Sequence, residues 1–191
     1  MNRAIDTQLQ NIEVIDASNS TSGILLNLSI QTEALTIKGG ANADNITGGT
    51  IADIITGGAG NDLFKYADSG QTGNVATGVV DRIADFATTA DDISGLGITG
   101  TATGEFSAAA GITGNTYAQA LTAANAVFAA ANSQSYFMTS FGTDSASAQG
   151  ILFLNMDNNG TAEGAILIGL SGQATSMSAA TALLVAGDIV A

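Results

Sequence analysis

The chain has 191 residues and a formal net charge of -13, with only four basic side chains, and 46% of its residues are hydrophobic. This length suffices for one domain or two small ones with a hydrophobic core. The charge argues against nucleic acid and anionic membranes as partners, because both bind basic patches. The absence of Cys and His excludes disulfides, Ser-His-Asp catalysis and imidazole-bound metals.

The sequence also argues against insertion into a membrane. No apolar run has the length of a transmembrane helix, and the first residues lack the apolar core of a secretory signal peptide. Strand-like sequence follows Met1 almost at once. We therefore expect the chain to be part of a longer protein.

Three short apolar segments near the N-terminus predict strands. They are rich in branched residues and separated by Asn, Ser and Gly, and they span Ile12–Ile15, Ile24–Ile30 and Ala34–Ile37. Ile37 and Leu28 lie nine and eighteen residues before Ile46, an apolar position of the glycine repeats that follow. We expect residues 1–38 to continue the stack that those repeats form, because one stack buries strand edges. A separate sheet is the alternative.

Residues 39–65 are three consecutive nine-residue units. Each begins with Gly-Gly and has Asp at its sixth position and a large apolar residue at its eighth. Glycine allows the positive φ of a tight turn, and the apolar residue fits a short strand that faces a core. Two units then complete one coil, so turns eighteen residues apart stack. Gly39–Asp44 should lie on Gly57–Asp62, with Gly48–Asp53 at the opposite edge.

Stacked turns of this kind are predicted to bind calcium. They gather carboxylates and backbone carbonyls, and such hard oxygen ligands suit Ca²⁺ rather than zinc or copper. The candidate ligands within the repeats are Gly40, Asn42, Asp44, Gly49, Asp53, Gly57, Ala59 and Asp62. Without a cation, the stacked carboxylates would repel one another. The alternative is a loop region whose spacing is accidental, which three copies in register disfavour.

The edge that carries Asp53 is the weaker candidate. Only the third unit has glycine at its fourth position, where the first has Asn42 and the second has Ile51. The unit expected to stack on Gly48–Asp53 is Tyr66–Gln71, which has lost the glycine pair. Asp68 is the carboxylate that we expect there.

The nonapeptide resembles the calcium-binding repeat of RTX proteins, G-G-x-G-x-D-x-U-x, which forms a parallel β-helix. The repeats end in D-x-F-x-Y at Asp62, Phe64 and Tyr66, and a polar loop follows at residues 67–78. D-x-I-x-D-F within Val79–Phe86 and D-x-I at Asp91–Ile93 come next. This succession is similar to the C-terminal end of type I secreted RTX proteins. The resemblance implies that Asp81 and Asp85 contribute to the last calcium sites. Solvated carboxylates at a strand end are the alternative.

Further elements are expected in the last hundred residues. Residues 94–115 read as a Gly/Thr/Ala-rich loop, and Thr116–Asn132 as a helix that Asn115 or Thr116 caps. The apolar face of this helix comprises Tyr117, Leu121, Ala124, Phe128 and Ala131. We expect this face to pack on the sheet, since the helix lacks the basic residues of an interfacial helix. Three strands should follow, at Ser135–Phe141, Ile151–Met156 and Ala165–Leu170.

The segment Asn155–Glu163 begins like an EF-hand loop, with Asn155, Asp157, Asn159 and Gly160 in the first places. Ile166 stands where the bidentate Glu belongs, and the flanks read as strands. A β-hairpin with an Asn-Gly turn is therefore favoured, and calcium binding is the alternative. The end of the chain, Ser176–Ala191, is similar to the C-terminal signal of type I secretion substrates in its Asp188-Ile189-Val190. A terminal core strand would look the same.

These observations predict a mainly β fold. We expect a parallel β-roll or β-solenoid with calcium turns, followed by a β-rich C-terminal cap with one helix. The expected divisions are coils without glycine pairs at 1–38, the calcium-binding roll at 39–66, and the cap with its secretion signal at 67–191.

The expected function is a calcium-dependent folding and secretion module of an extracellular bacterial protein. The resemblance implies an ABC exporter, a membrane-fusion protein and an outer-membrane channel as partners. Composition favours a surface-layer or adhesin component that self-associates, and the tail of a secreted hydrolase or toxin is the alternative. No catalytic constellation is evident, although Glu105 and Glu163 remain unplaced as partners of a glycosidase-type carboxylate pair. We predict that the chain is not an enzyme.

Overall fold

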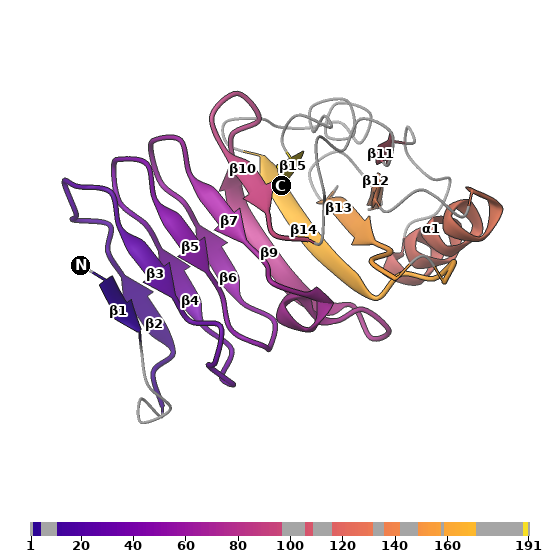
Figure 1. Cartoon of the computed structure of the whole chain (residues 1–191), viewed down its shortest axis with the longest axis horizontal. Helices are drawn as coiled ribbons and strands as arrows, with labels where there is room; N and C mark the ends of the chain where they lie inside the picture. Colours follow the sequence, from indigo (N-terminus) through magenta and orange to yellow (C-terminus); the bar gives the residue numbers. More distant parts are fainter. Residues whose placement is uncertain are drawn as a thin grey trace.

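The computed structural model describes residues 2–4, 11–96, 106–108, 116–131, 136–141, 149–157, 159–170 and 189–190. This part of the chain is mainly β, with two large sheets and one α-helix (Figure 1). The predicted β-rich class is therefore confirmed. The predicted divisions after residues 38 and 66 stay predictions.

Consecutive strands in the first half of the chain alternate between the two sheets. The first sheet has the order β1 (Asn2–Ala4), β3 (Leu25–Asn27), β5 (Asn45–Thr47), β7 (Leu63–Lys65), β10 (Asp92–Ser94) and β15 (Ile189–Val190). The second begins with β2 (Val14–Asp16), β4 (Thr36–Lys38), β6 (Ile54–Thr56) and β9 (Val79–Phe86). All of these neighbours pair in parallel. One strand of each sheet, with its turns, makes one coil.

The predicted eighteen-residue spacing holds for the glycine repeats. Thr36 pairs with Ile54, and Asn45 with Leu63. The coils before them are longer, since Leu25 pairs with Asn45 across twenty residues. Leu26 therefore stands in register with Ile46, and the expectation that Leu28 does so is wrong. The extra residues lengthen the turn, and Leu28 is buried within it.

Inward-facing residues of both sheets form one hydrophobic core. At each strand the central residue points inward, as the period of two requires. The core includes Leu26, Ile37, Ile46, Ile55 and Phe64, all of which are buried. It continues into Ile83, Phe86, Ile93, Tyr136, Leu152, Leu154 and Ile166. The repeats and the later strands thus share this core.

The second sheet continues beyond β9 into the C-terminal part of the chain. Its remaining strands are β14 (Gly164–Leu170), β13 (Gln149–Leu154), β12 (Tyr136–Phe141) and β11 (Phe106–Ala108). The strands predicted over Ser135–Phe141, Ile151–Met156 and Ala165–Leu170 are confirmed within two residues. β11 lies inside the segment 94–115 that we expected to be loop, and the polar loop at 67–78 contains a 3-10 helix (Ser69–Thr72) and the short β8 (Gly73–Asn74).

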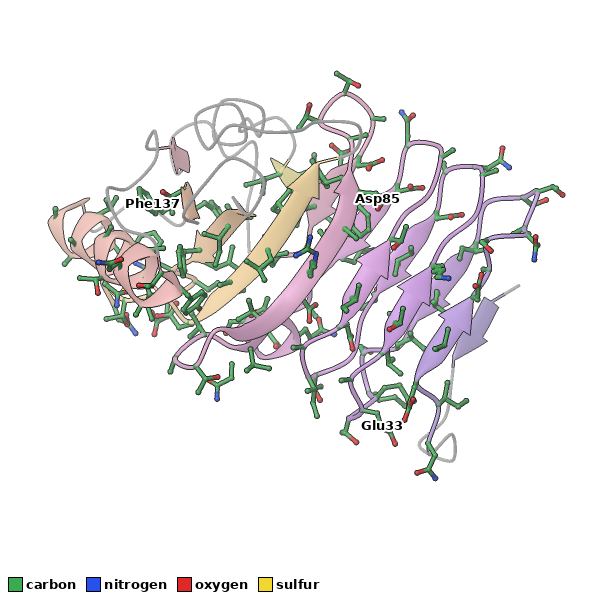
Figure 2. The ribbon with its side chains drawn as sticks, turned by 180° about the vertical axis from the view of Figure 1, so that it is seen from behind. Glu33, Asp85 and Phe137 are labelled. Atoms are coloured by element: carbon green, nitrogen blue, oxygen red, sulfur yellow. The ribbon has the colours of Figure 1, made fainter. Side chains whose placement is uncertain are left out.

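The predicted helix is α1 (Tyr117–Ala131). Thr116 caps it, because the Gln119 amide donates to Thr116 Oγ1 at 3.4 Å while the Thr116 amide donates to Gln119 Oε1 at 3.3 Å. Its apolar face packs on the second sheet as expected, and Phe128 meets Phe137 with ring centroids 6.5 Å apart. Figure 2 shows Phe137 on the side of the sheet that faces α1.

The last described strand, β15, pairs Ile189 with Ile93, and Ile189 is buried. Residues 189–190 thus form a strand whose Ile189 lies in the core, and Asp188 lies outside the described residues. The secretion signal stays a prediction. Among the residues that the structure describes, no helix has the length and hydropathy needed to cross a membrane.

Candidate functional site

The repeat turns lie at two opposite edges of the stack of coils. The first edge carries the turns that lead from the second sheet to the first, at residues 39–44, 57–62 and 87–91. The second edge carries those that lead back, at residues 28–35, 48–53 and 66–78. Figure 2 shows Asp85 at the first edge and Glu33 at the second. The predicted placement of the three glycine repeats is therefore correct.

The first and third repeat turns are in direct contact. The Ala59 amide donates to the Gly40 carbonyl at 3.1 Å, and the Leu63 amide donates to the Asp44 carbonyl at 2.7 Å. Asn42 and Ala59 are exposed at the outside of their turns. The stacking that calcium binding requires is thus present, and it already pairs some of the backbone groups that were expected to face a cation.

The glycines serve two different purposes. Only Gly58 and Gly60 of the third repeat have positive φ, of 104° and 133°, so the positive φ expected in every repeat is wrong for the first two. The other glycines of the repeats are needed because carboxylate and carbonyl oxygens pass too close to their Cα atoms to leave room for a Cβ. A Cβ at Gly39 or Gly57 would collide with the carboxylate of that same turn, and one at Gly48 would lie 2.7 Å from Asp53 Oδ2.

The Asp residues of the first edge form a ladder, which we call the first Asp ladder, of Asp44, Asp62 and Asp91. Each carboxylate accepts a hydrogen bond from a backbone amide of the preceding coil. Asp91 Oδ1 accepts from the Asp62 amide at 3.0 Å, Asp62 Oδ1 from the Asp44 amide at 2.9 Å, and Asp44 Oδ1 from the Ile24 amide at 2.8 Å. All three residues are buried. The ladder therefore ties four successive coils together.

The second Asp ladder consists of Asp53 and Asp81. Asp81 Oδ1 accepts from the Asp53 amide at 2.7 Å, and Asp53 Oδ1 accepts from the Leu35 amide at 2.8 Å. Asp81 thus occupies the position that we expected Asp68 to fill. Asp68 is exposed beside the 3-10 helix, because the coil between Ile54 and Arg82 spans 28 residues and its extra segment loops out.

Within a turn, the second carboxylate oxygen also caps the backbone. Asp44 Oδ2 accepts from the Gly40 amide and Asp53 Oδ2 from the Gly49 amide, each at 2.6 Å. Asp85 accepts from two amides at once, Gly57 to Oδ1 and Gly58 to Oδ2, both at 2.9 Å. The two aspartates of D-x-I-x-D-F therefore lie at opposite edges, Asp81 at the second and Asp85 at the first.

Two carboxylate oxygens in the ladders are buried without a partner among the described residues. They are Asp62 Oδ2 and Asp81 Oδ2, and the hydroxyl of Tyr66 is likewise unpaired. Tyr66 lies close enough to Asp81 for the two to shift each other's pKa, but Tyr66 Oη and Asp81 Oδ2 do not reach hydrogen-bond geometry. A buried, unpaired carboxylate oxygen is costly, and a bound cation is one means of satisfying it.

The electrostatics of the ladders favour proton or cation uptake. Burial raises the pKa of Asp81 to about 8, with a further contribution from the charge of Asp53. Burial also raises the pKa of Asp62 to about 6, assisted by the charges of Asp91, Asp44 and Asp85. The pKa values of Asp53 and Asp91 are raised chiefly by burial. Each of these groups is therefore harder to ionise in the fold than in the unfolded chain.

Two contributors to the site were not among the predicted ligands. Asp91 continues the first ladder, and the only sequence signal for it is the D-x-I that follows D-x-I-x-D-F. Tyr66 follows the third repeat directly and ends the D-x-F-x-Y element, which indicated no role in a metal site. In the described ranges, no group of three or more Asp, Glu, His or Cys side chains is arranged to hold a metal ion.

No family model matches the sequence, and no curated protein is significantly similar to it.

Proposed function

We propose that the stack from β2 to β10 is a calcium-binding β-roll that makes folding of the chain depend on calcium. The observation that carries this proposal is the pair of Asp ladders, in which Asp62 Oδ2 and Asp81 Oδ2 are buried and unpaired within the described part of the chain. Hard oxygen donors of this kind suit calcium. Asp44, Asp62 and Asp85 would hold ions at the first edge, and Asp53 and Asp81 at the second.

The mechanism is linkage between binding and folding. A cation that binds only the folded state stabilises it by about 2.7 kcal/mol per site at a hundredfold excess over Kd. It also offsets the cost of ionising the ladder carboxylates and the repulsion within a chain of charge -13. The chain would therefore remain unfolded where calcium is scarce and would fold where it is plentiful.

This behaviour suits a protein that is exported unfolded. We propose that the chain is the folding and secretion module of an extracellular bacterial protein, secreted through a type I exporter with its membrane-fusion and outer-membrane components. The resemblance of the repeats to RTX proteins supports the route. The low Lys content, the absence of Cys, His and Pro, and the repetitive β architecture support a structural role in a surface layer or adhesin, without enzymatic activity.

Replacement of Asp44 and Asp62 by Ala is expected to weaken calcium binding at the first edge and so to impair calcium-dependent folding. The variant removes two rungs of the ladder, so it should gain β signal in far-UV circular dichroism only at much higher calcium than the wild type, or not at all. The measurement is a calcium titration after metal removal with EDTA.

The matched control is the double variant Glu13→Ala/Asp68→Ala, which removes the same charge from exposed side chains. It should titrate as the wild type does. Identical folded spectra of the wild type with and without calcium, once metal removal is verified, would contradict the proposal. The repeats would then be a constitutive scaffold.

A further inference from the structure

The hairpin between β13 and β14 places two polar side chains side by side. Leu154 pairs with Gly164 in the antiparallel register, so Asn155 and Glu163 are the next opposed pair, and the Glu163 amide donates to the Leu154 carbonyl at 2.9 Å. Phe153 and Ala165 belong to the core under α1. Because side chains alternate along a strand, Asn155 and Glu163 lie on that same face, at the base of the loop.

Asn155 is fully buried, yet its amide has no partner. Neither Oδ1 nor Nδ2 makes a hydrogen bond to any part of the chain that the structure describes, and the residue is 0% exposed. Leaving a buried polar group unpaired costs about 1–3 kcal/mol. A Leu or Val would fill an apolar position without this cost. The unpaired amide at this position therefore indicates that Asn155 Oδ1 binds a ligand.

Other oxygen donors converge on the same loop at alternate positions. Counting Asn155 as the first, Asp157 is third, Asn159 fifth, Thr161 seventh and Glu163 ninth, with Gly160 sixth. Calcium loops of the EF-hand type use these positions, with glycine at the sixth and a backbone carbonyl at the seventh. Gly160 has φ of 86°, the conformation that a sharp turn needs.

The carboxylates of Glu163 and Asp157 are both held by amide groups of the loop. Glu163 Oε2 accepts from the Met156 amide at 2.7 Å, and Asp157 accepts from the amide and side chain of Asn159 at 3.0 and 2.8 Å. Burial raises the pKa of Glu163, and the neighbouring Asp157 adds to this effect. Negative charge is therefore concentrated beside the unpaired Asn155 amide.

The helix α1 holds the loop in place. The Ala162 amide donates to Asn125 Oδ1 at 2.8 Å, and a Cβ on Gly160 would lie 3.3 Å from Ala129 Cα. The loop is thus packed against a regular element on one side and built on a hairpin on the other. This arrangement fixes the donors before any ligand arrives, which lowers the entropic cost of binding.

We propose that this loop is a calcium site, with Asn155 Oδ1, the carboxylates of Asp157 and Glu163, the Asn159 side chain and the Thr161 carbonyl as ligands. Ca²⁺ accepts six to eight oxygens in flexible geometry, so water would complete the shell. Glu163 at the ninth position takes the place of the Glu that the EF-hand pattern puts at the twelfth. The site is separate from the Asp ladders, which lie at the two edges of the stack of coils.

The test counts calcium ions on the full chain by equilibrium dialysis with metal analysis. Glu163→Gln should bind one ion fewer than the wild type, whereas Glu13→Gln, an equal change at an exposed residue, should bind the same number. The Asp44→Ala/Asp62→Ala variant should retain the loop ion at any calcium concentration at which circular dichroism shows it to be folded. A failure of the β-roll proposal therefore leaves this ion in place, and a failure of the loop proposal leaves Glu163→Gln with the wild-type count.

A gain-of-affinity variant keeps the proposal testable if Glu163→Gln does not fold. Asn155→Asp adds a carboxylate at the first position, so it should bind this ion at least tenfold more tightly and melt higher than the wild type in calcium. At calcium concentrations that leave this site empty but keep the chain folded, it should melt lower, because the new charge is buried. If calcium does not reverse that destabilisation, and if the amide signals of Gly160 and Thr161 do not move in an NMR calcium titration, the loop is a plain hairpin turn and the proposal is wrong.

Discussion

In EDTA, the equilibrium between the unfolded and the folded chain is expected to favour the folded state more at pH 5 than at pH 9. The raised pKa values of Asp62, about 6, and Asp81, about 8, mean that the folded state binds more protons than the unfolded chain. Stability is then highest near and below the unfolded value of about 4 and falls as the pH rises through 6 and 8. For Asp81, which is buried, the full loss is on the order of 5 kcal/mol. Circular dichroism measures the folded fraction at each pH, and urea unfolding measures the stability wherever the protein is folded.

Two comparisons separate this effect from general acid behaviour. Asp81→Asn keeps an acceptor for the Asp53 amide but cannot ionise, so its stability in EDTA should no longer fall between pH 7 and 9. Saturating calcium should flatten the wild-type profile, because a cation favours the ionised form. A wild-type stability that rises from pH 5 to pH 9 in EDTA would show that the ladder carboxylates ionise freely in the fold.

Gly58→Ala is expected to destabilise the folded protein by about 3 kcal/mol or more. Gly58 has φ of 104°, which strains any residue with a Cβ, and the added methyl group would collide with the Gly40 carbonyl of the coil beneath it. The same turn supplies the Gly58 amide to Asp85, so a shift of the backbone would also weaken that contact. Thermal unfolding in calcium measures the loss.

The control for this variant is Gly70→Ala. Gly70 does not have positive φ, and the nearest obstacle to its Cβ is the exposed, movable carboxylate of Asp68, at 2.9 Å. This change should alter the melting temperature little. Similar melting temperatures for Gly58→Ala and the wild type would mean that the third repeat turn relaxes freely, and that its stacking on the first contributes little.

The repeat geometry could be predicted because it depends only on spacing. A nine-residue unit with one turn and one strand places Asp44 beneath Asp62 whatever else the chain does, and the observed registers agree. Helix α1 and strands β12 to β14 could also be predicted from the sequence, since their hydrophobic periods are strong. The alternation of apolar residues gives each strand its inward face without knowledge of its partners.

The rest depends on insertions that spacing alone does not resolve. The coil after Ile54 has 28 residues, and the sequence does not show which of its carboxylates lies at the second edge. The nine-residue spacing therefore predicts Asp68 at the position that Asp81 occupies. The twenty-residue coil likewise shifted the register from Leu28 to Leu26. The alternation of Phe64 and Tyr66 indicates that Tyr66 is buried, but its position beside Asp81 follows from tertiary packing.

The Asp ladders have a direction and two ends. Every ladder carboxylate accepts a hydrogen bond from a backbone amide of the coil before it. That amide therefore has its acceptor on the next coil. At the N-terminal side, Ile24 and Leu35 stand in the Asp positions and have no carboxylate to extend toward an earlier coil. At the C-terminal side, the Asp91 amide is already bonded to the Ala87 carbonyl of its own turn. The first ladder therefore ends within this chain at both sides, because no carboxylate precedes it at Ile24 and the Asp91 amide already has an acceptor.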